Sequence, residues 1–205
     1  MHSVSGQPDS ALSAASAALR DRVLTTAAEL FARKSFAATT TEEIAEAVQE
    51  LRGTVYYHLK NKQSILETIQ QRLMDNLMGE LTAIQQEEDV PATERLTRMV
   101  TVFTQFATKY PNEFATSLEG LKYLSGRARK KAEHRADAVC LILVDAIEDV
   151  LAETNNDTVD SVVAATAIFY TLATVYRWYR PRGRLKRSEF NSEVTRLLLT
   201  GLVDR

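Results

Sequence analysis

The chain has 205 residues, 45% of them hydrophobic, and a formal net charge of -2 at pH 7. This length and composition exclude an intrinsically disordered chain, and they fit one mid-sized domain or a small module joined to a larger one. Seven glycines and four prolines are few, and Val, Ile and Thr are diluted among Ala, Leu, Glu, Arg and Gln. We therefore expect an all-α protein of about nine helices. The near-neutral charge excludes a surface that coats nucleic acid uniformly, but it leaves room for a local basic surface.

Cysteine content and the first residues of the chain indicate a cytoplasmic protein. Cys140 is the single cysteine, so no intramolecular disulfide can form, and a reducing compartment is the simplest interpretation. Residues 1–16 contain no basic segment followed by an apolar run, so we expect a disordered tail and no export signal. The longest uncharged stretch, residues 161–176, is shorter than the roughly 20 apolar residues of a membrane span, so we expect no membrane association.

Prolines separate the chain into segments with helical periodicity. Pro91, Pro111 and Pro181 fall between these segments, as expected because proline is disfavoured inside helices. On this basis we expect helices near residues 17–34, 41–48, 52–59, 62–86, 92–109, 112–124, 127–153, 157–180 and 187–203. The second and third of these are so short that they need packing partners.

The first two expected helices form a small amphipathic unit. Apolar residues at three- and four-residue spacing give the first helix one buried stripe, which consists of Val23, Ala27, Leu30 and Phe31. Thr40 and Glu43 are spaced as a capping box at the start of the second helix, in which each side chain bonds the backbone N–H of the other residue. Phe36 closes the small core against the buried face of the second helix, which consists of Ile44, Ala45 and Val48.

The third expected helix carries the residues that point to function. Val55 and Leu59 give this helix one buried side, so its remaining side chains point outward. Two tyrosines, a histidine, an arginine and a threonine are unusual for a merely solvated surface, and they suit DNA. Arginine can bind guanine O6 and N7, and tyrosine and threonine can reach phosphates or thymine methyl groups. For His58 the alternative is a hydrogen-bonded core histidine, which ranks below a phosphate contact because His58 lies beside Tyr57.

Together these segments resemble the tetracycline-repressor (TetR) family of bacterial transcription regulators. The matching pieces are, in order, Ala27-Ala28-Glu29-Leu30-Phe31-Ala32, Ala38-Thr39-Thr40, Ile44-Ala45, Gly53-Thr54-Val55-Tyr56-Tyr57-His58 and Lys62. The resemblance implies a helix-turn-helix DNA-binding domain over residues 17–62. The residues that would face the major groove of DNA are Arg52, Thr54, Tyr56 and Tyr57. Those that would contact phosphates are Thr40, His58 and Lys62, and Gly53 would let the backbone approach DNA closely.

The turn before the third helix departs from the family pattern. Where the family usually has a glycine, an apolar residue and a small polar cap, this chain has Gln49, Glu50 and Leu51. A non-glycine residue in the left-handed region costs about 1–2 kcal/mol, and Leu51 has no oxygen for the N-cap. Glu50 lies where phosphates are expected, so it either accepts a hydrogen bond from a cytosine amino group or turns away. We therefore expect a remodelled turn.

Residues 63–205 contain no pattern of catalytic or metal-binding residues. The three histidines, His2, His58 and His134, are far apart in the sequence, and there is no glycine-rich phosphate loop or nucleophile elbow. We therefore expect neither enzymatic activity nor a metal or other cofactor. The resemblance instead implies that residues 63–205 form an effector-binding and dimerisation domain.

Two groups of residues in this half are candidates for effector contacts. The first group could line a pocket between helices, and it consists of Phe103, Phe106, Phe114, Leu118, Tyr123 and Leu141. The alternative is that these residues belong to the core, as most aromatic residues at helical spacing do. Trp178 begins a Trp-Tyr-Arg-Pro segment, directly after Arg177, that resembles the branch of the family sensing acyl-CoA thioesters. Its arginines could bind CoA phosphates or form a solvated surface at a helix C-terminus. The basic residues 126–131 allow the same two interpretations.

The last two expected helices are more apolar than one face of a helical bundle requires, above all at residues 161–176 and 197–202. Twofold pairing would bury them, and a central helix in a monomer is the alternative. The resemblance favours a four-helix dimer interface, which would hold two reading helices one turn of DNA apart, about 34–36 Å.

We therefore expect a ligand-responsive transcriptional repressor. It would bind double-stranded DNA at a palindromic operator as a homodimer and would be released by a small hydrophobic effector, for which an acyl-CoA is the candidate. A transcriptional activator that uses the same motif is one alternative. An all-helical protein-interaction module without DNA binding is the other, and an enzyme ranks last.

Overall fold

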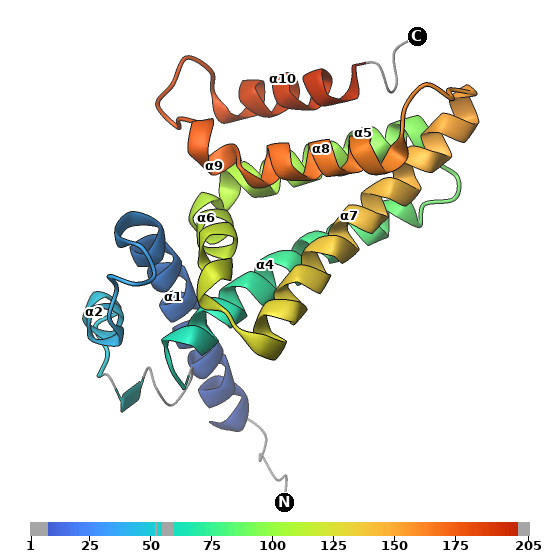
Figure 1. Cartoon of the computed structure of the whole chain (residues 1–205). Helices are drawn as coiled ribbons and strands as arrows, with labels where there is room; N and C mark the ends of the chain where they lie inside the picture. The colour runs from blue at the N-terminus through green and yellow to red at the C-terminus, as the bar shows by residue number, and fades with distance from the viewer. Residues whose placement is uncertain (1–7, 52, 55–59, 201–205) are drawn as a thin grey trace, which may run out of the picture.

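The computed structural model of the chain describes residues 8–51, 53–54 and 60–200. These residues form helices and loops without a β-strand, which confirms the expected all-α fold. Nine α-helices and one short 3-10 helix are present in this part of the chain (Figure 1): α1 (Pro8–Lys34), α2 (Thr41–Ala47), α4 (Lys62–Gln85), α5 (Ala92–Lys109), α6 (Pro111–Gly120), η1 (Leu121–Tyr123), α7 (Gly126–Thr154), α8 (Ser161–Ala173), α9 (Val175–Trp178) and α10 (Arg187–Leu199). The helix expected over residues 52–59 lies outside the described residues, apart from Gly53 and Thr54.

The first helix begins earlier than expected. The expectation of a tail over residues 1–16 is wrong for residues 8–16, which form the first turns of α1. Pro8 is tolerated in the first turn of a helix, because the first N–H groups have no partner within the helix in any case. The residues that follow are rich in alanine, the strongest helix former, at positions 11, 14, 15, 17 and 18.

The helix expected over residues 157–180 is shorter and interrupted. It begins at Ser161, because the Asp160 carboxylate accepts a hydrogen bond from the N–H of Val163 (2.9 Å) and caps the helix. It ends at Ala173, next to a Thr174 hydroxyl that donates back to the carbonyl of Tyr170 (2.7 Å), a contact that often bends helices. The short α9 follows. No helix within the described ranges is long and apolar enough to cross a membrane.

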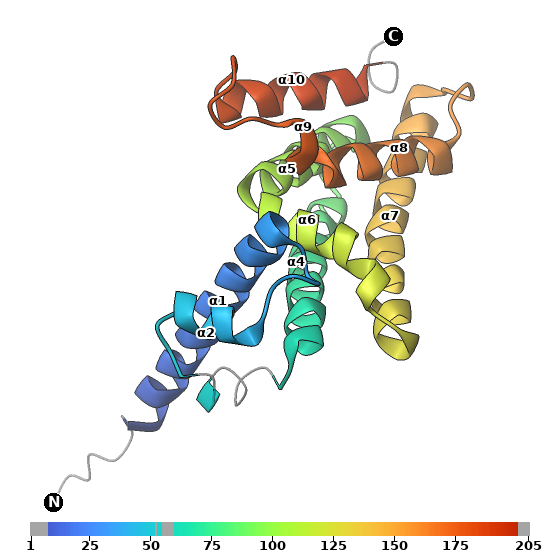
Figure 2. The ribbon, with the colours of Figure 1, turned by 60° about the vertical axis from the view of Figure 1, so that its left-hand side comes forward.

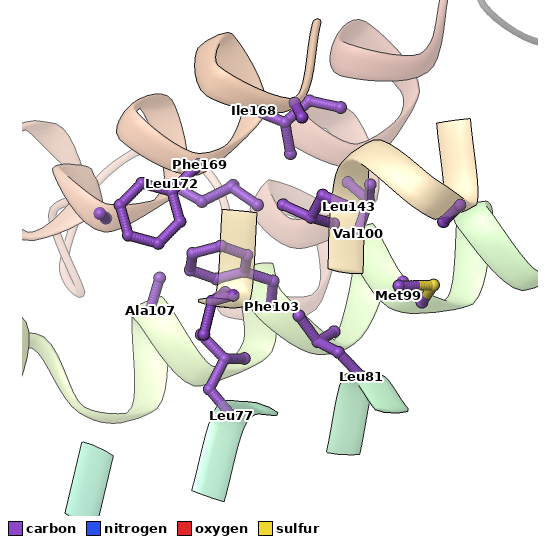
Figure 3. Close-up of a cluster of buried hydrophobic side chains, with 14 of the residues drawn as sticks. Leu77, Leu81, Met99, Val100, Phe103, Ala107, Leu143, Ile168, Phe169 and Leu172 are labelled. Atoms are coloured by element: carbon purple, nitrogen blue, oxygen red, sulfur yellow. The ribbon is translucent and has the colours of Figure 1, made fainter. Parts of the chain in front are cut away.

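The main core lies where α4, α5, α7 and α8 meet (Figure 3). Leu77, Phe103, Leu143 and Leu172, one from each helix, have no solvent exposure there. The Phe103 ring lies edge-on to Phe169, with the ring centroids 5.8 Å apart. Because each such side chain contributes about 1.5–3 kcal/mol when fully buried, this core holds the four helices together.

A second, smaller core joins α1, α2 and the first turns of α4, which we call the N-terminal unit. Its members are Val23, Leu24, Ala27, Ala28, Leu30, Phe31, Ile44, Ala45, Val48, Ile65 and Ile69. The remaining helices form the main body. The two parts meet along α1 and α6, where the Thr116 hydroxyl donates to the carbonyl of Ala28 (3.3 Å). Figure 2 shows α1 and α2 beside α4 and α6, with α10 at the far end of the molecule.

We expect Phe103→Ala to lower the free energy of unfolding by about 3–5 kcal/mol, because removal of a fully buried ring leaves a cavity among four helices. Urea denaturation followed by circular dichroism measures this change. Gln105→Ala, at an exposed position of the same helix, is the matched control and should change the free energy by at most about 0.5 kcal/mol. Equal effects of the two substitutions would contradict the packing described for Phe103.

Candidate DNA-binding site and effector region

Thr40 lies directly before α2 and caps it. The Thr40 hydroxyl accepts the N–H of Glu43 (3.1 Å) and the Glu43 carboxylate accepts the N–H of Thr40 (2.9 Å), which confirms the expected capping box. The Lys34 ammonium also donates to Glu43 at 2.6 Å. This hydrogen bond, together with the one from the Thr40 backbone, holds the pKa of Glu43 below its usual value. The start of α2 is therefore fixed, with Thr40 exposed at the surface.

The turn after α2 is a Schellman motif built without glycine. The N–H of Gln49 bonds to the carbonyl of Glu46 (3.0 Å) and the N–H of Glu50 bonds to that of Ala45 (2.9 Å), the two bonds that define this helix ending. Gln49 takes the left-handed conformation that glycine usually provides, with a φ of 60°. The strain expected from the sequence is therefore present at Gln49.

Arg22 of α1 holds this turn in place. Its guanidinium donates to the Glu50 carboxylate (3.2 Å) and to the carbonyl of Val48 (3.4 Å). Of the two alternatives for Glu50, the structure therefore has the one in which the carboxylate turns away, toward α1. Nothing in the sequence pointed to Arg22, because its partner lies 28 residues away. Leu51 points outward, with 80% of its surface exposed.

Four of the predicted DNA-binding residues lie in the described part of the chain: Thr40, Gly53, Thr54 and Lys62. A Cβ added to Gly53 would meet no atom within 4 Å, so the space above this backbone is open. The N–H of Thr54 bonds to the carbonyl of Leu51 (2.9 Å). The other four lie outside the described residues: Arg52, Tyr56, Tyr57 and His58.

Lys62 has a structural contact that the sequence did not reveal. Its ammonium donates to the carbonyls of Phe36 and Thr39, each at 2.8 Å, and lies 4.5 Å from the centre of the Phe36 ring. Lys62 thereby ties the first turn of α4 to the loop between α1 and α2. Among the residues that the structure describes, these two carbonyls take two of the three N–H donors of Lys62.

Two predicted effector residues, Phe103 and Phe114, are core residues in the structure. They are 0% and 1% exposed, and their rings stack with centroids 6.0 Å apart. Leu118, also predicted, packs against the same core. This arrangement matches the core alternative that the sequence left open, and a ligand could reach these rings only if neighbouring helices moved apart.

Phe106 lines a pocket of about 120 Å³ between α1, α4, α5 and α6, which we call the junction pocket. Its other lining residues are Leu24, Thr25, Ile69, Arg72, Leu73, Asn76, Tyr110 and Glu113. The Phe106 and Tyr110 rings lie 5.3 Å apart, and Arg72 is held by Asp21 of α1 at 2.6 Å. The junction pocket therefore has walls from both the N-terminal unit and the main body.

Glu113 is the titratable carboxyl group of the junction pocket. Burial raises the pKa of Glu113, the Glu29 carboxylate of α1 raises it further, and Arg72 acts in the opposite direction. Because the folded state binds this proton more tightly than the unfolded chain, Glu113 contributes most to stability at low pH. That contribution falls as the pH rises from the unfolded toward the raised folded pKa. The sequence pattern did not reveal this pocket, since its residues come from four helices.

The remaining predicted effector residues do not gather around this pocket. Tyr123 stacks on Phe36 of the N-terminal unit, with ring centroids 4.8 Å apart. Leu141 is 61% exposed on the outer side of α7. Trp178 is 44% exposed and lies against Phe190 of α10, with ring centroids 5.1 Å apart.

Arg177 lies at the surface beside α6. Its Nε donates to the Tyr176 hydroxyl (2.9 Å), and its guanidinium lies 3.5 Å from the Glu119 carboxylate. Burial is the main cause that raises the pKa of Tyr176. Since 61% of the Arg177 side chain is exposed, it keeps N–H groups available to a ligand.

The capped α2 and the tight turn after it, packed on α1 and α4, match the first part of a helix-turn-helix domain. Residues 23–69 match the family model of bacterial regulatory proteins of the tetR family. Residues 89–202, more than half of the chain, match the model of the tetracyclin repressor-like C-terminal domain. The chain belongs to the tetracycline-repressor family of transcription regulators.

Individual relatives cover nearly the whole chain. The transcriptional repressor KstR2 of Mycolicibacterium smegmatis is 25% identical over 188 residues, which cover 91% of each protein. A solved regulatory protein of the tetR family from Rhodococcus RHA1 has a TM-score of 0.81 at 24% identity, over 90% of this chain and 96% of its own. AibR, solved with isovaleryl coenzyme A and operator DNA, has a TM-score of 0.76 at 23% identity, over 87% and 97%. These two structures support the fold.

We expect Gln49→Gly to stabilise the N-terminal unit and Gln49→Val to destabilise it. Glycine adopts a φ of 60° without the strain of about 1–2 kcal/mol, and its freedom in the unfolded chain offsets about 0.5–1 kcal/mol of this gain. A β-branched residue is strained further at this angle. Thermal unfolding of both variants beside the wild type measures the difference. A lower midpoint for Gln49→Gly would show that Gln49 is not strained.

Proposed function

We propose that the protein is a ligand-responsive transcriptional repressor that binds a palindromic operator as a homodimer and is released by a small hydrophobic effector. One observation carries this proposal: α1, α2 and the start of α4 share a small core, and the backbone at Gly53 between them is open to a partner. Membership of the family supports it, as does the operator complex of AibR.

The proposed DNA contacts divide into two kinds. Thr40 and Lys62, with His58, would bind phosphates: the Thr40 hydroxyl accepts within the cap and can donate outward, and the third N–H of Lys62 has no acceptor among the described residues. The residues proposed to face the major groove are Arg52, Thr54, Tyr56 and Tyr57. Phosphate contacts set the position of the protein on DNA, and base contacts carry the sequence specificity.

The effector would act at the junction between the two parts of the molecule. The junction pocket of about 120 Å³ is smaller than the roughly 300–1,000 Å³ of most ligand sites, so a ligand would have to enlarge it. Enlargement would separate α1 from α6 and so shift residues 52–59, which we call the reading segment, relative to the main body. Such a ligand binds the shifted conformer better, and this difference in affinity is what drives release from DNA.

An acyl-CoA thioester is the proposed class of effector. Arg177 presents a largely exposed guanidinium next to the exposed ring of Trp178, a combination suited to phosphates and a nucleotide base. Arg177 contacts Glu119 near one end of α6, and Glu113 near the other end lines the junction pocket. α6 therefore connects the two places. The AibR complex contains an acyl-CoA of this class.

We expect acyl-CoA thioesters to release the protein from its operator, weakening DNA binding by about 5–150-fold. The operator is first selected from a pool of random duplexes, and its fluorescence anisotropy is then followed during titration with thioesters of different acyl groups and with free CoA. Arg177→Gln should raise the thioester concentration needed by about tenfold or more, because a charge-assisted hydrogen bond is removed. Arg177→Lys, which keeps the charge, should have a smaller effect. If no thioester releases the operator, the acyl-CoA assignment is wrong and the repressor assignment stands.

The proposed dimer interface follows an apolar stripe on α8. Val163 and Tyr170 are 67% and 58% exposed, and with Ala167 between them they share one side of the helix. Leu197 of α10 is 72% exposed. Large apolar side chains at this level of exposure indicate a surface that a second copy of the chain would bury.

We expect the double substitution Val163→Glu and Tyr170→Glu to convert the dimer into a monomer, because it places like charges opposite each other across the twofold axis. Light scattering coupled to size-exclusion chromatography measures the mass. Gln105→Glu, which adds a carboxylate at an exposed position of α5, is the control and should remain dimeric. A dimeric double variant would place the interface elsewhere.

A further inference from the structure

The first turns of α7 are rich in basic residues. Residues 126–131 read Gly-Arg-Ala-Arg-Lys-Lys. Arg129 pairs with Glu133 at 2.8 Å, but Arg127, Lys130 and Lys131 are exposed and form no ion pair with any residue that the structure describes. We call these three residues the α7 basic patch.

The three residues of the α7 basic patch share one side of the helix. Each residue of an α-helix turns by about 100°, so positions separated by three or four residues lie close together. Ala132 and Val139 lie on a different side and are buried against the rest of the main body. The patch therefore faces solvent as a group.

Helix stability does not account for these cations. The positive end of a helix dipole favours acidic side chains, yet the first turn of α7 has none. Neighbouring cations on one side of a helix also repel one another. The helix dipole and the repulsion between cations both raise the free energy of the protein without a partner. A polyanionic partner would neutralise these charges and remove both costs.

The start of α7 is fixed to the N-terminal unit through Tyr123. The Tyr123 ring stacks on Phe36 at 4.8 Å, and its carbonyl accepts a hydrogen bond from Gln63, the residue after Lys62, at 3.2 Å. Gly120 allows α6 to approach α4 closely, since an added Cβ would lie 2.6 Å from Cδ1 of Leu66. The patch is thus attached to the same part of the protein as the first turn of α4 and the loop before α2.

The patch lies close to the point where the chain before α7 contacts the N-terminal unit. Arg127 follows Tyr123 by four residues, so their Cα atoms are at most about 14 Å apart, less than half of the 34–36 Å turn of roughly ten base pairs. Figures 1 and 2 both show the first turn of α7 at the same end of the molecule as residues 53–54 and the start of α4. The loop between α9 and α10 lies at the opposite end.

We propose that the α7 basic patch binds the phosphate backbone of the same DNA duplex that the helix-turn-helix reads. This inference rests on the proposed function and adds sequence-independent contacts outside the reading segment. Duplex DNA carries one negative charge per roughly 1.7 Å of its length, so it can meet three exposed cations at once. The patch lies on an open helix surface at the DNA-binding end, which favours a duplex over a small ligand that needs an enclosing pocket.

The test compares two triple variants that remove the same charge from opposite ends of the molecule. One combines Arg127→Gln, Lys130→Gln and Lys131→Gln, and the control combines Arg182→Gln, Arg184→Gln and Lys186→Gln in the loop between α9 and α10. Fluorescence anisotropy with a labelled duplex of unrelated sequence gives the affinity at a series of salt concentrations. The plot of log affinity against log salt has a negative slope. The patch variant should make this slope shallower by about 0.9 for each phosphate that is no longer bound, or about 2.7 per protomer for three. The control should keep the wild-type slope.

The outcomes separate this inference from the proposed function. An unchanged slope in the patch variant, or an equal decrease in both variants, overturns the inference. So does an unchanged slope combined with weaker binding of coenzyme A, which would assign the patch to the phosphates of a small ligand. If the wild type itself has no affinity for duplex DNA, the proposed function is wrong, and the inference that rests on it is wrong as well. The charge-keeping variant with Arg127→Lys, Lys130→Arg and Lys131→Arg should retain the slope, and far-UV circular dichroism should show all variants folded.

Discussion

The first turns of α4 are the part on which the rest of the molecule depends, because this helix belongs to both cores. Ile65 and Ile69 complete the core of the N-terminal unit, and Leu77 further along lies in the main core. A helix of 24 residues is a rod of about 36 Å, so its two ends move together. Lys62, bonded to the carbonyls of Phe36 and Thr39, fastens the helix-turn-helix to the end of this rod.

The contact between α1 and α6 is a second connection between the same two parts. It contains the Thr116 to Ala28 hydrogen bond, the junction pocket and Glu113, whose burial raises its pKa. With α4 alone, the N-terminal unit could still turn about its point of attachment. The second contact limits that rotation, and under the proposed function it is the place where a ligand that enlarges the junction pocket would favour a different angle.

The sequence predicted what depends on local spacing and missed what depends on long-range contacts. The all-α class, the Thr40 capping box and the strain at Gln49 followed from residues within one turn of each other. The partner of Glu50 did not, because Arg22 is 28 residues away. The boundaries of α8 were missed because single caps set them. Phe103 was placed in a pocket because an aromatic residue at helical spacing has the same sequence pattern in a core as beside a ligand. The predicted contacts with DNA and effector remain predictions.

The net charge of -2 hides how the charges are distributed. Three acidic residues of the N-terminal unit are paired at close range: Glu43 with Lys34, Glu50 with Arg22 and Asp21 with Arg72. A paired carboxylate has little effect beyond the screening length of about 8–10 Å. Arg127, Lys130 and Lys131 at the start of α7, by contrast, form no ion pair with any residue in the described part of the chain. An acidic protein can in this way present a positive surface to a polyanion, since the local pairing of charges decides the sign that the partner meets.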